Sequence, residues 1–331
     1  MTENWQSSRC PLTSIAGIRV GHYEDDHALT GCTVILCDQG AVGGVDQRGG
    51  APGTRQTDAM YPMHLVEQVN AVVLAGGSAF GLDAASGVVQ YLEEQEIGFD
   101  VRVARVPIVP AAILFDLNIG RADIRPTAQF GYQACLKAAR EPPAEGNVGA
   151  GCGATVGKIL GIEQAMKAGI GSACYQIGKD LKVGALVAVN AFGDIIDPQT
   201  GQIIAGARLP AAPPERRFAD TLEVMRSMAS AKTLRFGPPQ DTVIGVVITN
   251  ARLNKEETNK VAQMAQDGLA RAVRPAHTML DGDTLFALST GEHAADVNAI
   301  GAFAAEAVTQ AILNAVKAAK PAGGLPSWSS L

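Results

Sequence analysis

The sequence predicts a layered α/β fold in which sheets and helices are stacked closely together. Of its 331 residues, 47% are hydrophobic but only 5% are aromatic, and 37 are glycine. The interior must therefore be filled by Ala, Val, Ile and Leu, whose side chains suit layers that approach each other closely. A chain of this length can form one large or two ordinary domains.

The first half of the chain alternates short apolar runs with glycine. These runs predict strands at residues 18–20, 33–36 and 72–74. The glycine-rich stretch 41–57 should be irregular backbone near a functional surface. After the third strand, Ser78 is expected to cap a helix that continues to Leu92. A further helix is expected within residues 132–139.

The second half is more regular towards its end. Apolar runs rich in β-branched residues predict strands at residues 185–189, 242–248 and 284–288. Asn254 followed by Glu257 is a capping-box arrangement that predicts the start of a helix. Residues 297–316 should form a long Ala-rich helix.

Residues 205–240 lack a regular pattern, apart from a short helical patch near 222–228. Five prolines lie in this stretch, at positions 210, 213, 214, 238 and 239. A segment of this length without regular structure is unusual inside a compact domain. We therefore expect a mobile or processed connector at about 205–241.

Charge and cysteine usage exclude several classes of protein. The net charge is −6 with the signs interspersed, which argues against a nucleic-acid surface and gives no reason to expect a membrane partner. No run is expected to span a membrane, and the N-terminus lacks the pattern of a signal peptide. Six cysteines without zinc-like spacing are expected to be reduced and buried. A cytoplasmic enzyme is the expectation.

Two glycine-rich motifs resemble known functional loops but do not match them. Ser78 lacks the glycine two residues later that a nucleophile elbow requires, and no supporting context supplies a histidine. The run 147–158 fails the phosphate-loop pattern because Ile159 follows Lys158, and it matches the dinucleotide fingerprint only weakly. The run still predicts close backbone approach with one lysine nearby. Lys158 is either a solvated charge or a desolvated lysine with a lowered pKa.

Thr242 is the strongest candidate for a reactive group. It stands between the unpatterned connector and a buried strand, directly after Asp241. Cleavage of the Asp241–Thr242 bond would give Thr242 a hydroxyl nucleophile and a free α-amine, whose pKa of about 8 makes it a usable base. The alternative is that Thr242 only begins a strand, for which threonine is well suited.

Three other polar residues could join Thr242. Asp281 and Asp283 lie at the start of a predicted strand, and alternate residues there point the same way. If the strands that begin at 242 and 284 pair, Asp281 lies beside Thr242. The Asp-Gly-Asp sequence could equally be a plain turn. Asn190 closes another apolar strand, where it could begin a turn or donate to an oxyanion.

Several motifs in order resemble one family over nearly the whole chain, the DmpA-type aminopeptidases (L-aminopeptidase/D-esterase) and endo-type nylon-oligomer (6-aminohexanoate oligomer) hydrolases. The first matches are Gly-Ala-Pro-Gly from Gly50, Gly-Gly-Ser-Ala-Phe-Gly-Leu from Gly76 and Val-Pro-Ala-Ala-Ile-Leu-Phe-Asp-Leu from Val109. The glycine run ending at Lys158 and Val-Asn-Ala-Phe-Gly from Val189 follow. The Asp241–Thr242 junction with Val-Ile-Thr-Asn-Ala from Val247, and His-Thr-Met-Leu-Asp-Gly-Asp-Thr-Leu-Phe-Ala from His277, complete the series.

The resemblance implies a four-layer αββα sandwich that cleaves itself before a Thr or Ser. Residues 1–241 and 242–331 would be two fragments of one folded domain, in a homo-oligomer that is often a tetramer. By position, Thr242 resembles the nucleophile, Asn190 the oxyanion donor and Lys158 a polar neighbour that supports activation. Asp281 and Asp283 resemble the acidic pair that orients the new α-amine.

Two departures from the family pattern concern substrate binding and processing. Phe115 stands where relatives have Tyr, so a hydroxyl that could contact substrate or oxyanion is absent. Asp241 stands where the nylon-hydrolase type has Asn, so the rate of processing could differ. An Asp-Thr junction also occurs in the glycosylasparaginases, which do cleave themselves.

The function implied is hydrolysis of an amide bond by an autoprocessed N-terminal threonine. The expected substrate is a short peptide or an ω-amino-acid oligomer, with no metal or organic cofactor. Two alternatives remain open: acyl transfer in the manner of the ornithine acetyltransferases, and a non-catalytic metabolite-binding relative.

Overall fold

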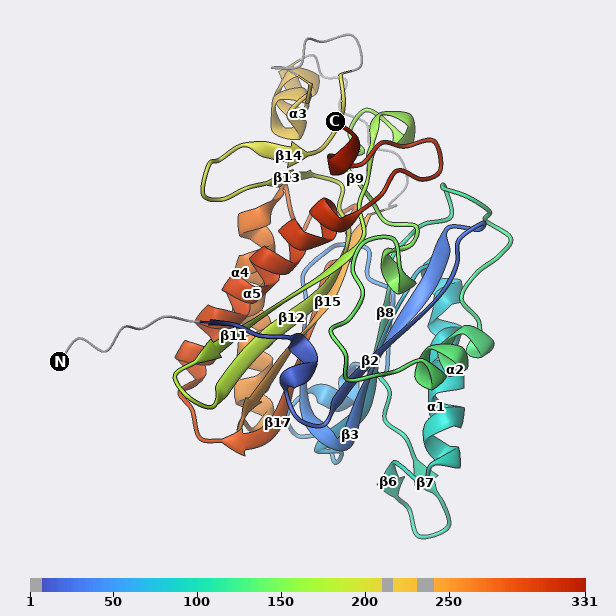
Figure 1. Cartoon of the computed structure of the whole chain (residues 1–331), viewed down its shortest axis with the longest axis vertical. Helices are drawn as coiled ribbons and strands as arrows, with labels where there is room; N and C mark the ends of the chain where they lie inside the picture. Colours follow the sequence, from blue (N-terminus) through green and yellow to red (C-terminus); the bar gives the residue numbers. More distant parts are fainter. Residues whose placement is uncertain (1–7, 210–216, 231–240) are drawn as a thin grey trace, which may run out of the picture.

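Helices lie on both outer faces of the molecule, and strands lie between them, in a computed structural model that describes residues 8–209, 217–230 and 241–331 (Figure 1). One outer layer is formed by α4 (Lys255–Ala272) and α5 (Val297–Ala318), and the other by α1 (Ala84–Glu94) and α2 (Ala128–Leu136). A further helix, α3 (Thr221–Ser230), lies at one end of the molecule, beside the small sheet of β13 and β14 (Figure 1).

Ten strands form one continuous sheet with the order β1-β11-β12-β15-β17-β3-β5-β8-β4, and β2 pairs with β3. Their bounds are β1 (Ser8–Arg9), β2 (Ile18–Asp25), β3 (Thr30–Gln47), β4 (Thr54–Arg55), β5 (Gln68–Ala75), β8 (Ala111–Ile113), β11 (Ile170–Ile177), β12 (Leu181–Asn190), β15 (Thr242–Ala251) and β17 (Thr284–His293).

Smaller strands form separate ribbons, and six short 3₁₀ helices connect the larger elements in the described chain. The strands are β6 (Phe99–Asp100), β7 (Arg105–Val106), β9 (Thr155–Val156), β10 (Met166–Lys167), β13 (Asp194–Ile196), β14 (Ile203–Ala205) and β16 (Val273–Arg274). The 3₁₀ helices are η1 (Leu12–Ser14), η2 (Asp58–Met60), η3 (Ser78–Asp83), η4 (Gly149–Gly151), η5 (Ile162–Gln164) and η7 (Trp328–Ser330).

Three large apolar clusters separate four layers of secondary structure. Along β15, Val243 and Val247 pack with α4 and α5, whereas Ile244 and Val246 belong to a second cluster. That second cluster also contains residues of β5, so it fills the space between the two halves of the sheet. A third cluster joins β3 and β5 to α1 and α2. The predicted αββα sandwich is therefore confirmed, and its small side chains fit the close layers.

Strand register determines which residues meet at one edge of the central strands. In the antiparallel pair of β12 and β15, Asn190 lies opposite Thr242. In the parallel pair of β15 and β17, Ile244 lies opposite Thr284. The expected pairing of the strands that begin at 242 and 284 is confirmed. The start of β15, the start of β17 and the end of β12 therefore lie together.

The structure confirms some local predictions and corrects others. The capping box at Asn254 and Glu257 is present at the start of α4. The stretch 41–57 is not irregular throughout, because β3 continues to Gln47. Ser78 makes no capping hydrogen bond with its side chain: it begins η3, and α1 begins only at Ala84. The amides of this turn are held instead by Asp116, which accepts from Gly77, and by the carbonyl of Leu114.

The connector predicted at 205–241 is described only in part. The helical patch expected near 222–228 is α3. Residues 210–216 and 231–240 lie outside the described residues.

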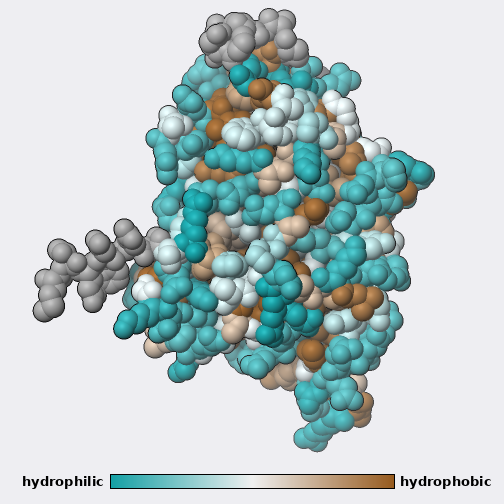
Figure 2. Space-filling model, in the orientation of Figure 1, coloured by the Kyte–Doolittle hydropathy of each residue, from teal (hydrophilic) through white to brown (hydrophobic). Residues whose placement is uncertain are grey.

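Helix α5 is long and apolar enough to match a membrane span by length and composition, contrary to the sequence-based expectation. Two-thirds of its most apolar window, 67%, is buried within the molecule. It packs against α4 and against β11 and β12, so its apolar residues belong to the first cluster. On the face shown in Figure 2, hydrophobic residues are scattered among hydrophilic ones.

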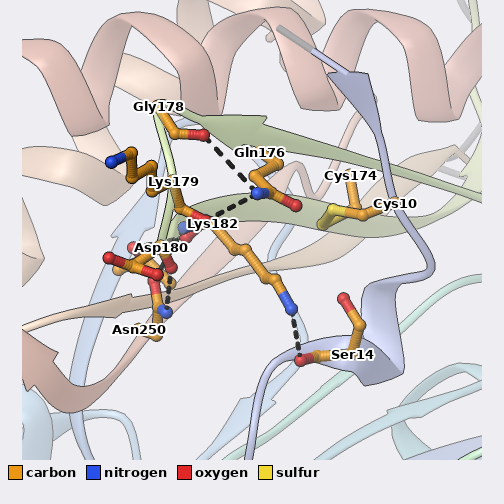
Figure 3. Close-up of a disulfide and its surroundings, with 10 residues drawn as sticks. Cys10, Ser14, Cys174, Gln176, Gly178, Lys179, Asp180, Lys182 and Asn250 are labelled. Atoms are coloured by element: carbon orange, nitrogen blue, oxygen red, sulfur yellow. Dashed lines mark hydrogen bonds between the residues drawn. A yellow bond between two sulfur atoms is a disulfide. The ribbon is translucent and has the colours of Figure 1, made fainter.

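A disulfide joins Cys10 to Cys174, so the expectation of six reduced cysteines was wrong for this pair (Figure 3). The two residues are 164 positions apart, but β1 pairs with β11 and the amide of Cys10 donates to the carbonyl of Cys174. Spacing in the sequence could not reveal this edge contact. The other four cysteines are free and buried. The expectation of a cytoplasmic enzyme rested in part on reduced cysteines. This disulfide removes that support, because disulfides are rare in reducing compartments.

Replacing Cys10 or Cys174 by Ser should lower the free energy of unfolding by about 2–5 kcal/mol, because the bond restricts a long loop of the unfolded chain. Urea unfolding with and without dithiothreitol measures the effect. Reduction should bring the wild type to the level of either variant, and the double variant should equal the single ones. A wild type that is insensitive to reductant and no more stable than the variants would contradict the pairing.

Candidate active site

The peptide bond between Asp241 and Thr242 lies buried where the central strands begin and end. Thr242 is 3% exposed and its Oγ donates to the carbonyl oxygen of Asp241. The same carbonyl accepts the backbone N–H of Gly282 at 2.9 Å. A Cβ at position 282 would lie 2.8 Å from the Thr242 hydroxyl, so glycine is required for this approach. The hydroxyl therefore touches the carbonyl of its own preceding peptide, which a backbone donor polarises.

Lys158 forms a buried ion pair with the side chain of Asp241. Its ammonium nitrogen is 2.8 Å from Oδ1 of Asp241, and the two side chains are 6% and 5% exposed. Oδ1 of Asp241 makes no directional hydrogen bond, so the carboxylate is held by charge. The hydrogen bonds of the ammonium go to the backbone oxygen of Asn190 at 3.0 Å and to its Oδ1 at 2.9 Å. The sequence-based alternative of a solvated lysine is wrong.

Two sets of hydrogen bonds hold the glycine run that ends at Lys158, one through the backbone of Lys158 and one from the side chain of Lys167. Gly157 has φ +73°, and the next amide, of Lys158, donates to the carbonyl of Phe192 at 3.0 Å. Lys167 is fully buried beneath the run and donates to the carbonyls of Gly151 and Ala154, at 3.2 and 2.8 Å. Burial lowers the pKa of Lys167 to about 7. Sequence reasoning missed this residue, because nothing in a two-residue strand marks its lysine as buried.

Asn190 is held by groups on two segments, residues 155–158 and the chain at Phe115. Its Oδ1 accepts from Lys158 and from the amide of Thr155 at 3.1 Å, and its Nδ2 donates to the carbonyl of Phe115 at 2.9 Å. In this uncut chain the N–H of Gly282 donates to the Asp241 carbonyl. The oxyanion role of Asn190 stays a prediction. Phe115 is partly exposed and touches Asn190 through its backbone, and a contact of its ring with substrate also stays a prediction.

Asp116 supports the same corner, although sequence reasoning did not identify it. It follows Phe115 and is 2% exposed. Its carboxylate accepts from the hydroxyl of Thr30 and from the amide of Gly77, both at 2.7 Å. Burial raises the pKa of Asp116 to about 6. Asp116 thus links the Gly76-Gly77 turn to the segment in which the Phe115 carbonyl accepts from Asn190.

Asp281 is buried and accepts hydrogen bonds from two segments. Oδ1 accepts from the amide of Phe192 at 3.3 Å, and Oδ2 accepts from the amide of Thr278 at 3.0 Å and from its hydroxyl. Burial, with the nearby Asp283 and Asp241 carboxylates, raises the pKa of Asp281 to about 6.

Asp283 contacts strand β15 directly. Its Oδ1 accepts the amide of Val243 at 2.8 Å. Its Oδ2 accepts the amide of His277 at 3.0 Å and lies 2.9 Å from Nδ1 of the same residue. The turn that places His277 against Asp283 was not predictable from the motif, although the motif contains both residues. The two carboxylates are thus more than turn residues.

The site brings all five predicted catalytic residues together, namely Thr242, Asn190, Lys158, Asp281 and Asp283. Their contacts include one another, Asp241, backbone groups and the side chains of His277 and Thr278. Within the described ranges, no group of three or more His, Cys, Asp or Glu side chains could hold a metal ion.

Replacing Asp281 by Asn should change how stability depends on pH between about 4 and 6. The pKa of Asp281 is raised in the folded state, so its protonation stabilises the fold at low pH and that contribution is lost as pH rises through about 6. Relative to the wild type, the variant should therefore gain roughly 2–3 kcal/mol across this window.

Urea unfolding at pH 4, 5, 6 and 7 measures this difference. The hydrogen bonds that the variant loses lower its free energy of unfolding by the same amount at every pH. Asp116 contributes the same pH dependence to both proteins. Parallel curves would show that Asp281 titrates near its ordinary pKa.

Comparison with known proteins places this chain in one family. The family model described as Peptidase family S58 matches residues 11–327. An uncharacterized aminopeptidase of Mycobacterium tuberculosis is 41% identical over 347 aligned positions, covering 97% of each chain. A 6-aminohexanoate-oligomer endohydrolase of Kocuria sp. is 30% identical, covering 91% of this chain and 84% of that one.

A solved structure shares the architecture at lower identity. The L-aminopeptidase D-Ala-esterase/amidase of Ochrobactrum anthropi, described as a variant of the Ntn hydrolase fold, superposes with a TM-score of 0.70 at 19% identity. The superposition covers 96% of this chain and 88% of that one. Since the family model spans nearly the whole sequence, the chain belongs to peptidase family S58.

Proposed function

We propose that this chain is an autoprocessing amide hydrolase in which Thr242 becomes an N-terminal nucleophile. The observation that carries the proposal is the contact of the Thr242 hydroxyl with the Asp241 carbonyl, which also accepts from Gly282. Such a hydroxyl needs a polarised carbonyl and a proton acceptor nearby. Names of relatives that include aminopeptidase and oligomer endohydrolase support hydrolysis of an amide bond.

The first reaction is cleavage of the chain itself. The Oγ of Thr242 attacks the carbonyl carbon of Asp241, and its proton passes to the departing nitrogen as the C–N bond breaks. The product is an ester between Asp241 and Oγ of Thr242, with a free α-amine on Thr242. Water then attacks the ester carbon, the C–O bond breaks, and Oγ recovers a proton. Developing charge on the Asp241 oxygen is stabilised by the Gly282 N–H.

The fragments 1–241 and 242–331 should stay together after cleavage. Strand β15 lies between β12 and β17 in the middle of the sheet. Its residues contribute to the apolar clusters on both faces. The new chain end therefore stays fixed in the sheet.

The second reaction uses the same group on a substrate. The Oγ of Thr242 attacks a substrate amide, the α-amine takes the proton and gives it to the leaving amine, and water frees the acyl group. In this proposal Asp283, which accepts the amide of Val243, orients that amine, and Lys158 supports activation of the hydroxyl. The proposed substrates are short peptides or ω-amino-acid oligomers.

Thr242→Ala should abolish cleavage, because the variant lacks the attacking oxygen. Intact-mass analysis of the purified wild type should show fragments 1–241 and 242–331, whereas the variant should show one full-length chain. Thr242→Ser is the matched control, since it keeps a hydroxyl and should still be cleaved. An unsplit but fully active wild type would overturn the mechanism.

Asn190→Ala and Asn190→Asp separate the two roles open to Asn190. If Nδ2 donates to the oxyanion, both variants should lose roughly 10² to 10³-fold in kcat, as for other single oxyanion donors. If Oδ1 only holds Lys158, Asn190→Asp should keep far more activity than Asn190→Ala. Rates are compared on fully cleaved protein, so that processing does not enter the comparison. We expect both variants to be equally impaired.

A further inference from the structure

Asp241 is the first acyl group that this site would carry. Its carbonyl carbon lies next to Oγ of Thr242, and its side chain extends to Lys158. Two carbons, Cα and Cβ, separate that carbonyl from the carboxylate. The site is thus filled by a four-carbon diacid unit whose far carboxylate rests against a buried ammonium.

Self-cleavage and substrate hydrolysis pass through the same kind of intermediate. In the first, the ester on Oγ of Thr242 carries residue 241, and in the second it carries the acyl part of a substrate. Oγ of Thr242, the N–H of Gly282 and the ammonium of Lys158 would surround the acyl group in both reactions. The space that Asp241 occupies therefore indicates which acyl group the site accepts.

Cleavage removes the carboxylate partner of Lys158. Hydrolysis gives Asp241 a second negative charge close to Asp281 and Asp283, and repulsion among these carboxylates favours its departure. The Lys158 ammonium then keeps only the two oxygen atoms of Asn190 as acceptors among the described residues. A buried ammonium without an anion is costly, so a substrate carboxylate that restores the pair would be bound favourably.

We infer, on the basis of the proposed function, that the mature enzyme prefers acyl groups with a carboxylate two carbons from the scissile carbonyl, and that Lys158 binds this carboxylate. Aspartyl and succinyl amides have this spacing. The carboxylates of Asp281 and Asp283 oppose a further anion, but both are held by backbone amides and the new Thr242 amine adds a positive charge when protonated.

Hydrolysis of three p-nitroanilides by the cleaved enzyme tests the preference. Aspartyl and asparaginyl p-nitroanilide differ in charge but hardly in shape, and alanyl p-nitroanilide lacks the group altogether. We expect kcat/KM for the aspartyl compound to exceed that for the asparaginyl compound by roughly 10- to 10²-fold, the range of a hydrogen bond to a charged group. An asparaginyl compound hydrolysed equally well or better would overturn the inference.

A binding measurement tests Lys158 without relying on turnover. Asp241→Gly, made in the Thr242→Ala background so that the chain stays uncut, removes a side chain that corresponds in size to acetate and leaves Lys158 without its carboxylate. Acetate should raise the melting temperature of Asp241→Gly, whereas the neutral isostere acetamide should not. The double variant Asp241→Gly/Lys158→Met in the same background should show no response to acetate.

The two experiments distinguish failure of the inference from failure of the proposed function. Hydrolysis of the alanyl compound without any preference for the aspartyl one refutes the inference but leaves the amide hydrolase standing. If no amide is hydrolysed, the proposed function fails, and the response to acetate alone decides whether Lys158 is an anion site. Equal responses to acetate and acetamide, or a response that persists without Lys158, would overturn that assignment.

Discussion

The parallel pairing of β15 with β17 is the constraint on which the site depends. It sets Ile244 against Thr284, and this register brings the residues just before both strands together. Gly282 then donates to the Asp241 carbonyl and Asp283 accepts from Val243. A shift of one residue would turn every side chain of β15 to the opposite face and would exchange the apolar layers that hold the strand. The buried packing on both faces of β15 therefore fixes the chemistry at its first residue.

Three carboxylates and one ammonium lie close together in the buried site, and their charge balance would differ between the uncut chain and the proposed cut form. Asp241, Asp281 and Asp283 oppose one another, and Lys158 neutralises only one of them. Burial and the neighbouring carboxylates raise the pKa of Asp281, which means that its ionised form is held at a cost to stability. Backbone amides of Phe192, Thr278 and Val243 offset part of that cost. Departure of Asp241 in the proposed cleavage would relieve this repulsion but would leave Lys158 without its carboxylate partner, so the cut site would favour a different ligand from the uncut one.

The sequence reveals those parts of the site that lie at strand boundaries. Thr242, Asp281 and Asn190 were predictable because a buried apolar run indicates where its strand begins or ends, and the polar residue at that boundary stands out. The αββα layers followed from composition only as far as a stacked α/β class, and the specific order of layers came from family resemblance. Contacts made by the backbone or across long separations were not predictable. The Gly282 donor, the burial of Lys167, the His277–Asp283 contact and the Cys10–Cys174 bond all depend on turns or edges that no local pattern records.

The position of the Asp241–Thr242 bond is compatible with the proposed cleavage, because a cut there would leave the central sheet paired. Thr242 is the first residue of β15, and the amide of the next residue, Val243, donates to the Asp283 side chain. Breaking the bond before Thr242 would remove two backbone contacts of Asp241, its β-bridge with Asp281 and the hydrogen bond from Gly282. The pairing of β15 with β12 and β17 would stay in place. A cut a few residues later would divide a strand that is buried along its whole length. A new amine formed at this boundary would therefore stay fixed, because Thr242 pairs with β12 opposite Asn190 and the amide of Val243 is held by Asp283.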